Sequence, residues 1–235
     1  MTNTNEKKLD LKQSIDFIRI LIYAAIVGIG AGAIGTLFTV SVNSVIELRA
    51  QYPWLIYFLP LGGVVIVLLY QLAKYKDAGT DLVINSIHSE PHLPVRVGPL
   101  IFVSSVITHL FGGSAGREGA ALQIGGSVGS FVSKTLHLKE EDKKTLIMAG
   151  MSGCFSALFG TPLTAAIFPL EVVHVGYMQY AALLPCAIAS LIGHSVAIAL
   201  NLVEPMHHIG TVPNLDAITA IAVIVLSLLA GLVSR

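Results

Sequence analysis

The chain has 235 residues, of which 54% are hydrophobic and 12% are charged, and this charged fraction is about half that of a typical soluble protein. Basic and acidic residues balance to a net charge of zero at pH 7, so nothing in the charge indicates nucleic-acid binding. Cys154 and Cys186 both lie in apolar segments, where a thiol acts as a small hydrophobic group, and no disulfide framework is expected.

Apolar blocks recur along the chain, and several reach the roughly 20 residues that a helix needs to cross the hydrocarbon core of a bilayer. They occupy residues 18–42, 54–73, 97–115, 120–132, 146–170, 180–203 and 217–233. Because they recur so far along the chain, the pattern predicts an all-α, polytopic membrane protein rather than a signal peptide before a soluble domain. Lys7, Lys8 and Lys12 precede the first block, which predicts a cytoplasmic N-terminal tail over residues 1–14.

Several of the predicted elements are short or interrupted. The first block carries glycines at positions 28, 30, 32 and 35, which predict close packing of helix backbones. The second block is followed by a short helix over 81–88, a span that ends at Phe111, a helix from about Glu118 to Leu136, a charged loop, and two short apolar helices hinged at 160–162. Short hydrophobic segments interrupted by Gly and Pro are typical of a binding site built from discontinuous helices.

Residues 112–126 read "GGSAGREGAALQIGG" and place Arg117 and Glu118 in a glycine-rich break between apolar blocks. Non-helical backbone at membrane depth persists only where it is buried in protein or lines a watery cavity. The first N–H groups of the following helix lack intrahelical partners and, with the positive end of the helix dipole, form an anion site. The Glu118 carboxylate can occupy that site and leave it on protonation, so we predict that Glu118 is both gate and proton carrier.

Other interpretations of this break remain. Arg117 and Glu118 can pair with each other or with neighbours as a structural lock. A nucleotide-binding loop is disfavoured, because no G-x-G-x-x-G follows a strand and no P-loop lysine is present. An intramembrane enzyme is disfavoured, because no H-E-x-x-H, second carboxylate within a span or serine–histidine pair stands out. We therefore expect no enzymatic activity, no metal and no cofactor.

The stretch "GREGAALQIGGSVG" (116–129) resembles the G-R-E-G-x-x-x-Q-x-G-G signature of the CLC family of chloride channels and anion/proton antiporters. The downstream "AGMSGCFSALFGTPLTAAIFPLEVV" (149–173) is similar to the stretch that follows it in the family, at a matching separation, and the resemblance covers about residues 79–176. It implies broken, re-entrant helices in a multi-pass protein of the cell membrane. It also implies that Glu118 is the gate, and that the amides of Arg117, Gly119 and Ala120, beside Gly116, flank the outer anion site.

Two positions depart from the chloride branch of the family. Its G-S-G-I-P turn corresponds here to "GTDLV" (79–83), in which Gly79 is kept and Thr80 replaces the serine of the central anion site. Thr80 retains a hydroxyl donor, so Gly79 and Thr80 stay candidate anion-binding residues, and Asp81 is expected to cap the short helix. The inner proton-passing glutamate corresponds to Val172, and its neighbour Glu171 is expected to be a carboxylate at a helix end near the cytoplasmic surface. Together the two departures resemble the fluoride branch more than the chloride antiporters.

The CLC resemblance implies two inverted-topology halves per subunit, and this chain shows one G-R-E-G break. We therefore expect residues 15–203 to form the first repeat, and 204–235 to hold a linker and the first helix of an incomplete second repeat. Three functions follow as hypotheses: a CLC-type chloride channel or anion/proton antiporter gated by Glu118, a fluoride/proton antiporter, or a fragment that transports nothing. The expected partners are a small inorganic anion, protons, the lipid bilayer and, in a complete protein, a second copy in a homodimer.

Overall fold

The computed structural model describes residues 2–74, 79–88, 93–173, 179–200 and 216–233, and within these ranges the regular structure is entirely helical. The prediction of an all-α fold with broken helices is confirmed. The chain divides into two compact units, Met1–Glu204 and Pro205–Arg235. The elements are α1 (Thr2–Gln51), η1 (Pro53–Phe58), α2 (Leu59–Leu72), α3 (Thr80–His88), α4 (Val97–Leu110), α5 (Arg117–Thr135), α6 (Glu140–Phe159), α7 (Pro162–Val173), α8 (Tyr180–Ala199) and α9 (Ala217–Val233).

Among the described residues, three helices are long and apolar enough to cross a bilayer: Ser14–Gln51, Pro53–Leu72 and Tyr180–Ala199. The chain is therefore a multi-pass membrane protein. The first of these spans is part of α1, whose 50 residues run without a break from Thr2, so residues 2–14 of the predicted tail are themselves helical. Good helix formers such as Glu6, Lys7 and Leu11 populate that stretch, and local propensity extends the apolar helix into it.

Three of the helices between these spans are short: α3 has 9 residues, α4 has 14 and α7 has 12. The short helix predicted over 81–88 is present as α3 and begins at Thr80. The predicted hinge is also present: α6 ends at Gly160, which adopts a left-handed conformation with φ 66°, and α7 begins at Pro162. A glycine takes that conformation without strain, and proline at the first turn needs no hydrogen-bonded N–H, so this sequence ends one helix and starts the next.

One expectation at this hinge was wrong. The helix before Gly160 is not short, because α6 has 20 residues and begins at Glu140, inside the stretch expected to be a charged loop. Glu140, Glu141 and Asp142 occupy the first turn of α6, where their negative charge is stabilised by the positive end of the helix dipole. The connection between α5 and α6 is correspondingly brief.

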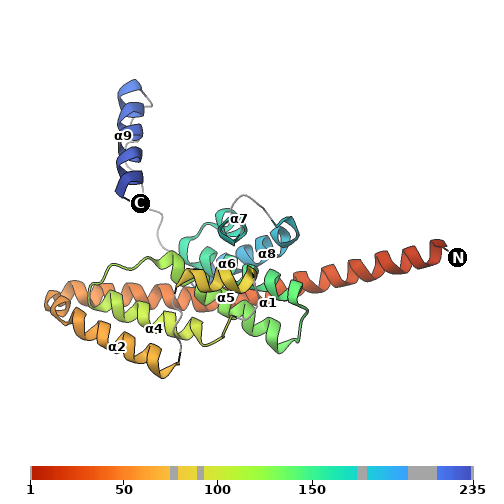
Figure 1. Cartoon of the computed structure of the whole chain (residues 1–235), viewed down its shortest axis with the longest axis horizontal. Helices are drawn as coiled ribbons and strands as arrows, with labels where there is room; N and C mark the ends of the chain where they lie inside the picture. The colour runs from red at the N-terminus through yellow and green to blue at the C-terminus, as the bar shows by residue number, and fades with distance from the viewer. Residues whose placement is uncertain (1, 75–78, 89–92, 174–178, 201–215, 234–235) are drawn as a thin grey trace. The chain divides into compact units, whose positions relative to one another are not determined.

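In the larger unit, α5, α6 and α8 gather about the middle of α1, while α2 and α4 lie side by side along its C-terminal half (Figure 1). Helix α6 is the most enclosed, and every residue from Leu146 to Leu158 is buried. The largest hydrophobic cluster is built around it and joins Phe38 of α1, Ile124 of α5, Met151 of α6 and Leu170 of α7.

Glycines bring these helices into backbone contact. A Cβ added to Gly125 of α5 would collide with the carbonyl oxygen of Gly150 in α6, and one added to Gly193 of α8 with that of Gly153. A Cβ on Gly32 of α1 would lie 2.7 Å from the Cα of Gly193. The close packing predicted from the glycines of the first block is confirmed, and such contact is how membrane helices associate where hydrophobicity provides no driving force.

The smaller unit contributes α9, which is the apolar helix predicted over 217–233. Asp216 caps it, since the Thr219 backbone N–H donates to Asp216 Oδ1 at 2.8 Å. Hydrogen bonds from the Thr219 side chain and backbone lower the pKa of the Asp216 carboxyl. This capping aspartate favours the start of a helix at this point in the sequence.

A leucine at Gly32 tests the backbone contact between α1 and α8. Because the new side chain would meet the Gly193 backbone, which cannot rotate away, we expect Gly32→Leu to lower the free energy of unfolding by about 3 kcal/mol or more. The measurement is the temperature at which detergent-solubilised protein loses its monodisperse size-exclusion peak. Gly63→Leu in α2 is the matched control, because nothing lies within 4 Å of a Cβ at Gly63. Equal losses in the two variants would contradict the packing argument.

Candidate functional site

The first turn of α5 is open to a ligand on its N-terminal side. Gly116 is the N-cap residue, with extended backbone at φ −69° and ψ 144°, and no side-chain capping hydrogen bond is made there. Helix α4 ends at Leu110, and Gly112 with φ 80° turns the chain toward α5. The backbone N–H groups in the first turn of α5 are therefore not capped by a side chain of the N-cap residue. An anion site at a helix N-terminus requires such uncapped N–H groups.

Thr80 and Gly119, which the sequence places far apart, lie side by side. A Cβ built on Gly119 would stand 2.8 Å from the Thr80 hydroxyl oxygen. Gly79 precedes Thr80 with φ 129°, a conformation that residues with a side chain rarely adopt, and no atom lies within 4 Å of a Cβ at Gly79. The N-terminus of α3 thus meets the N-terminus of α5, and the two stretches proposed from the sequence are brought together.

The Glu118 side chain lies over this N-terminus. One carboxylate oxygen, Oε2, is 2.8 Å from the position that a Cβ on Gly116 would take, so the side chain is turned back toward the cap. Glu118 is exposed, and among the described residues its carboxylate makes no hydrogen bond or ion pair. The Glu118 carboxylate is therefore near the N-terminus of α5 but is not hydrogen-bonded to the backbone N–H groups of its first turn.

The Arg117 side chain bonds to a residue of α1 and not to the neighbouring Glu118. Its guanidinium Nη2 donates to the side-chain oxygen Oδ1 of Asn43 on α1 at 2.9 Å. This bond ties the start of α5 to α1, and it supports the interpretation of Arg117 as a lock with a neighbour. Sequence reasoning assigned no role to Asn43, although an amide directly after an apolar block is a signal that could have indicated a polar contact between helices.

Gln123 is a second residue without an assigned role in the sequence analysis. Its Nε2 donates to the carbonyl oxygen of Gly119 at 3.2 Å, and its own Oε1 is buried without a hydrogen-bond partner among the residues that the structure describes. Gln123 is 5% exposed, so this amide lies directly beneath the first turn of α5. The signal was present, because this glutamine is the Q of the G-R-E-G-x-x-x-Q pattern.

The other residues named from the sequence are in α5, α7 and α3. Ala120 is buried in the first turn of α5, which leaves its backbone rather than its side chain as a possible ligand contact. Glu171 is exposed near the end of α7, while Val172 is half-buried and packs against the large hydrophobic cluster. The side chain of Asp81, and with it the expected cap of α3, lies outside the described residues. In the part of the chain that the structure describes, no group of three or more metal-ligating side chains is found.

Residues 62–235 match the family model for voltage-gated chloride channels. The chain belongs to this family. Among curated relatives of this CLC chain, the chloride/fluoride channel protein of Pseudomonas syringae pv. tomato is 37% identical over 214 residues, which are 90% of this chain and 47% of that protein. The H(+)/Cl(-) exchange transporter ClcA of Vibrio campbellii is 30% identical over 168 residues, covering 65% of this chain and 36% of that protein.

Solved structures show the same fold. A CLC-type fluoride/proton antiporter superposes with a TM-score of 0.84 and 31% identity, covering 93% of this chain and 56% of the antiporter chain. A slow cyanobacterial Cl−/H+ antiporter superposes with a TM-score of 0.68 at 21% identity, which shows the shared fold alone. This chain therefore spans about half the length of the CLC proteins that it matches.

The bond between Arg117 and Asn43 can be tested by removing its acceptor. We expect Asn43→Ala to lower the free energy of unfolding by about 1.5 kcal/mol, because a half-buried guanidinium loses a charge-assisted hydrogen bond. Asn43→Asp keeps an acceptor oxygen and should restore stability. Chemical unfolding in detergent, followed by tryptophan fluorescence, measures the difference. The control is Ser44→Ala, the next and more exposed residue of α1; a loss in the control as large as in Asn43→Ala would remove this role.

Proposed function

We propose that the complete protein carries a small inorganic anion across the cell membrane, with Glu118 as gate and proton carrier. The observation that carries the proposal is the meeting of the Thr80 hydroxyl with the first turn of α5 at Gly119, beside an exposed Glu118. A hydroxyl, a set of helix-terminal amides and a carboxylate that can compete for them form an anion site with its own gate.

The proposed site uses each predicted residue in a defined way. Thr80 offers its hydroxyl, and the backbone amides of Arg117, Gly119 and Ala120 face the anion. Gly79 and Gly116 leave those donors uncovered, since neither position carries a side chain. Gln123 bonds to the Gly119 carbonyl and steadies the turn, while Arg117 holds the start of α5 against α1.

Protonation couples the carboxylate to the anion. An ionised Glu118 is attracted to the same amides as the anion and excludes it, because two negative charges cannot share the site without strong repulsion. A protonated Glu118 has no charge, so it can leave the amides to the anion. Entry of an anion is thereby linked to uptake of a proton. The names of the relatives are those of channels, exchangers and antiporters, so we propose transport rather than catalysis.

Fluoride is the anion that we propose over chloride. Thr80 replaces the serine of the chloride branch, and Val172 stands where chloride antiporters carry a glutamate. A curated relative that covers 90% of this chain is named a chloride/fluoride channel protein, and the solved neighbour with a TM-score of 0.84 is a fluoride/proton antiporter. Fluoride is small and strongly hydrated, so short hydroxyl and amide hydrogen bonds, which are stronger to a charged acceptor, suit it.

We further propose that residues 15–203 act as one CLC-type repeat and that 204–235 hold a linker and the first helix of another, with two complete subunits forming a homodimer. The separation of Pro205–Arg235 from the larger unit supports this division. Inverted repeats place an ion site at their interface, so both repeats are needed for a closed pathway.

Glu118→Gln tests the gate. A neutral amide imitates the protonated carboxylate and cannot exchange a proton, so proton movement should cease while anion flux persists or is blocked. The measurement uses liposomes that hold the complete protein, with a pH-sensitive dye for protons and an ion-selective electrode for the anion. Glu171→Gln is the matched control, since Glu171 is an exposed carboxylate on α7, a helix that contributes no residue to the proposed site. Proton coupling that survives in Glu118→Gln would exclude Glu118 as the carrier.

Paired efflux from liposomes loaded with fluoride or chloride tests the choice of anion. We expect faster fluoride efflux, and we expect Thr80→Val to reduce the fluoride affinity about tenfold or more, because it removes one hydrogen bond to an anion while keeping the side-chain shape. Thr80→Ser keeps the hydroxyl and serves as control. Chloride efflux as fast as fluoride efflux would return the protein to the chloride-transporting branch.

A further inference from the structure

A basic pocket of about 510 Å³ lies where the ends of α2, α4, α5 and α6 meet. Four of its lining residues are cationic: Lys74, Arg96, Lys134 and Lys143. Lys143 pairs with Glu140 at 2.6 Å, whereas Lys74, Arg96 and Lys134 make no ion pair with the residues that the structure describes. Three neighbouring positive charges that have no ion-pair partner among the described residues are attractive to an anion.

The floor of the basic pocket is polar but already bonded. Ser130 and Ser133 of α5 line it, and both are buried. The Ser130 hydroxyl donates to the Leu93 carbonyl at 2.6 Å, and the Ser133 hydroxyl donates to the Ser130 carbonyl at 2.9 Å. Because these protons are engaged, the attraction for an anion rests on the cations at the rim.

An ion pair indicates on which side of the membrane the basic pocket lies. Arg19, near the start of the first membrane span, lies 3.6 Å from Asp142 in the first turn of α6, beside the pocket residue Lys143. The pocket is therefore on the N-terminal side of α1, together with the basic α5–α6 connection. Excess Lys and Arg mark the cytoplasmic side, and the cytoplasmic leaflet carries the anionic lipids.

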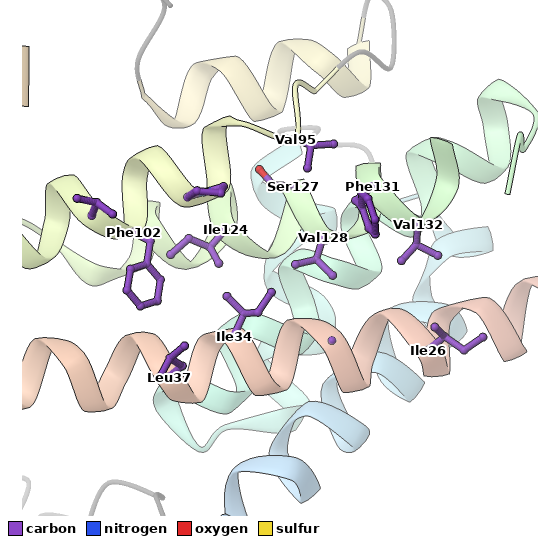
Figure 2. A pocket seen from close by; sticks show the side chains of 14 residues that line it. Ile26, Ile34, Leu37, Val95, Phe102, Ile124, Ser127, Val128, Phe131 and Val132 are labelled. Carbon is purple, nitrogen blue, oxygen red and sulfur yellow. The ribbon is translucent and has the colours of Figure 1, made fainter. Parts of the chain in front are cut away.

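An apolar groove of about 690 Å³ adjoins the basic pocket, between α1 on one side and α4 and α5 on the other (Figure 2). Val95 lines both the groove and the pocket. Along α1 the groove extends from Ile26 to Leu37, which is about 16 Å of helix at 1.5 Å per residue. The hydrocarbon core is about 30 Å thick, so the length of the groove along α1 is about the thickness of one leaflet.

We propose that the basic pocket and the apolar groove together bind one anionic phospholipid of the cytoplasmic leaflet. Lys74, Arg96 and Lys134 hold its phosphate, and an acyl chain lies along the groove against Phe102 and Val103. A soluble phosphate would use the pocket alone, whereas a lipid would use both the charged pocket and the apolar groove that adjoins it. Lys134 lies at the opposite end of α5 from Glu118, about 24 Å away along the helix, so this lipid site is independent of the proposed ion gate.

Lipid binding to the purified 235-residue chain tests the proposal. Delipidated protein in detergent is titrated with phosphatidylglycerol or phosphatidylcholine of identical acyl chains, and bound lipid is counted by native mass spectrometry. We expect phosphatidylglycerol to bind more tightly, and the double variant Arg96→Gln, Lys134→Gln to weaken it about tenfold or more, since each cation near the surface contributes to the attraction of an anionic headgroup. Equal binding of the two lipids would overturn the proposal.

Two control variants separate this site from general surface charge and from contact with bulk lipid. Lys139→Gln, Lys144→Gln removes two cations of the same face that do not line the pocket, and it should leave phosphatidylglycerol binding unchanged. Val103→Trp should fill the groove and weaken lipid binding, whereas Leu191→Trp, at an exposed position of α8, should not. Size-exclusion profiles like that of the unaltered chain establish that each variant is folded.

Three results would contradict the lipid assignment. A loss in Lys139→Gln, Lys144→Gln as large as in the pocket variant would mean that only net charge matters. Full lipid binding in Val103→Trp would mean that the groove is covered by protein rather than by an acyl chain. Competition by inorganic phosphate or glycerol 3-phosphate at concentrations like those of the lipid would assign the pocket to a soluble phosphate.

Discussion

At Gly125 the backbone of α5 lies against the backbone of α6 at Gly150, with no space for a side chain between them. Gly129 meets the Leu146 carbonyl of α6 in the same way, and Gly153 and Gly193 repeat the arrangement between α6 and α8. Lipid tails are as apolar as leucine, so burial of apolar surface gives these helices little reason to associate. Close van der Waals contact, which depends on the absence of side chains, provides the association.

That contact determines where the candidate ion site lies. With α6 enclosed by α1, α5, α7 and α8, the N-termini of α3 and α5 are held beside each other. A site made of backbone amides has no flexible side chain to adjust its geometry, so it needs rigid helices. The close packing below the first turn of α5 supplies that rigidity, and the Arg117–Asn43 bond fixes the turn against α1.

Several hydroxyls within the apolar bundle are bonded inside their own helices, unlike the amides of the first turn of α5, which have no side-chain cap. Hydroxyls of Thr36, Ser127 and Ser152 donate to the carbonyl four residues before them in their own helices. Such bonds remove the cost of burying a hydroxyl without requiring a partner helix. Within α5 the charged residues lie at its two ends: Arg117 and Glu118 are in the first turn, and Lys134, which lines the basic pocket, is in the last.

The sequence by itself determined the class of protein, the family and the break at 112–116, because apolar block length, glycine and proline are local signals that need no knowledge of packing. It also identified Thr80 and Glu118 as candidates, since their motifs are local. Only the tertiary structure decided that Thr80 meets Gly119, that Arg117 bonds to Asn43, and that α6 begins at Glu140. The basic pocket could not be predicted from the sequence either. Its cations lie at the ends of four helices, and only the packing of these helices brings the cations together.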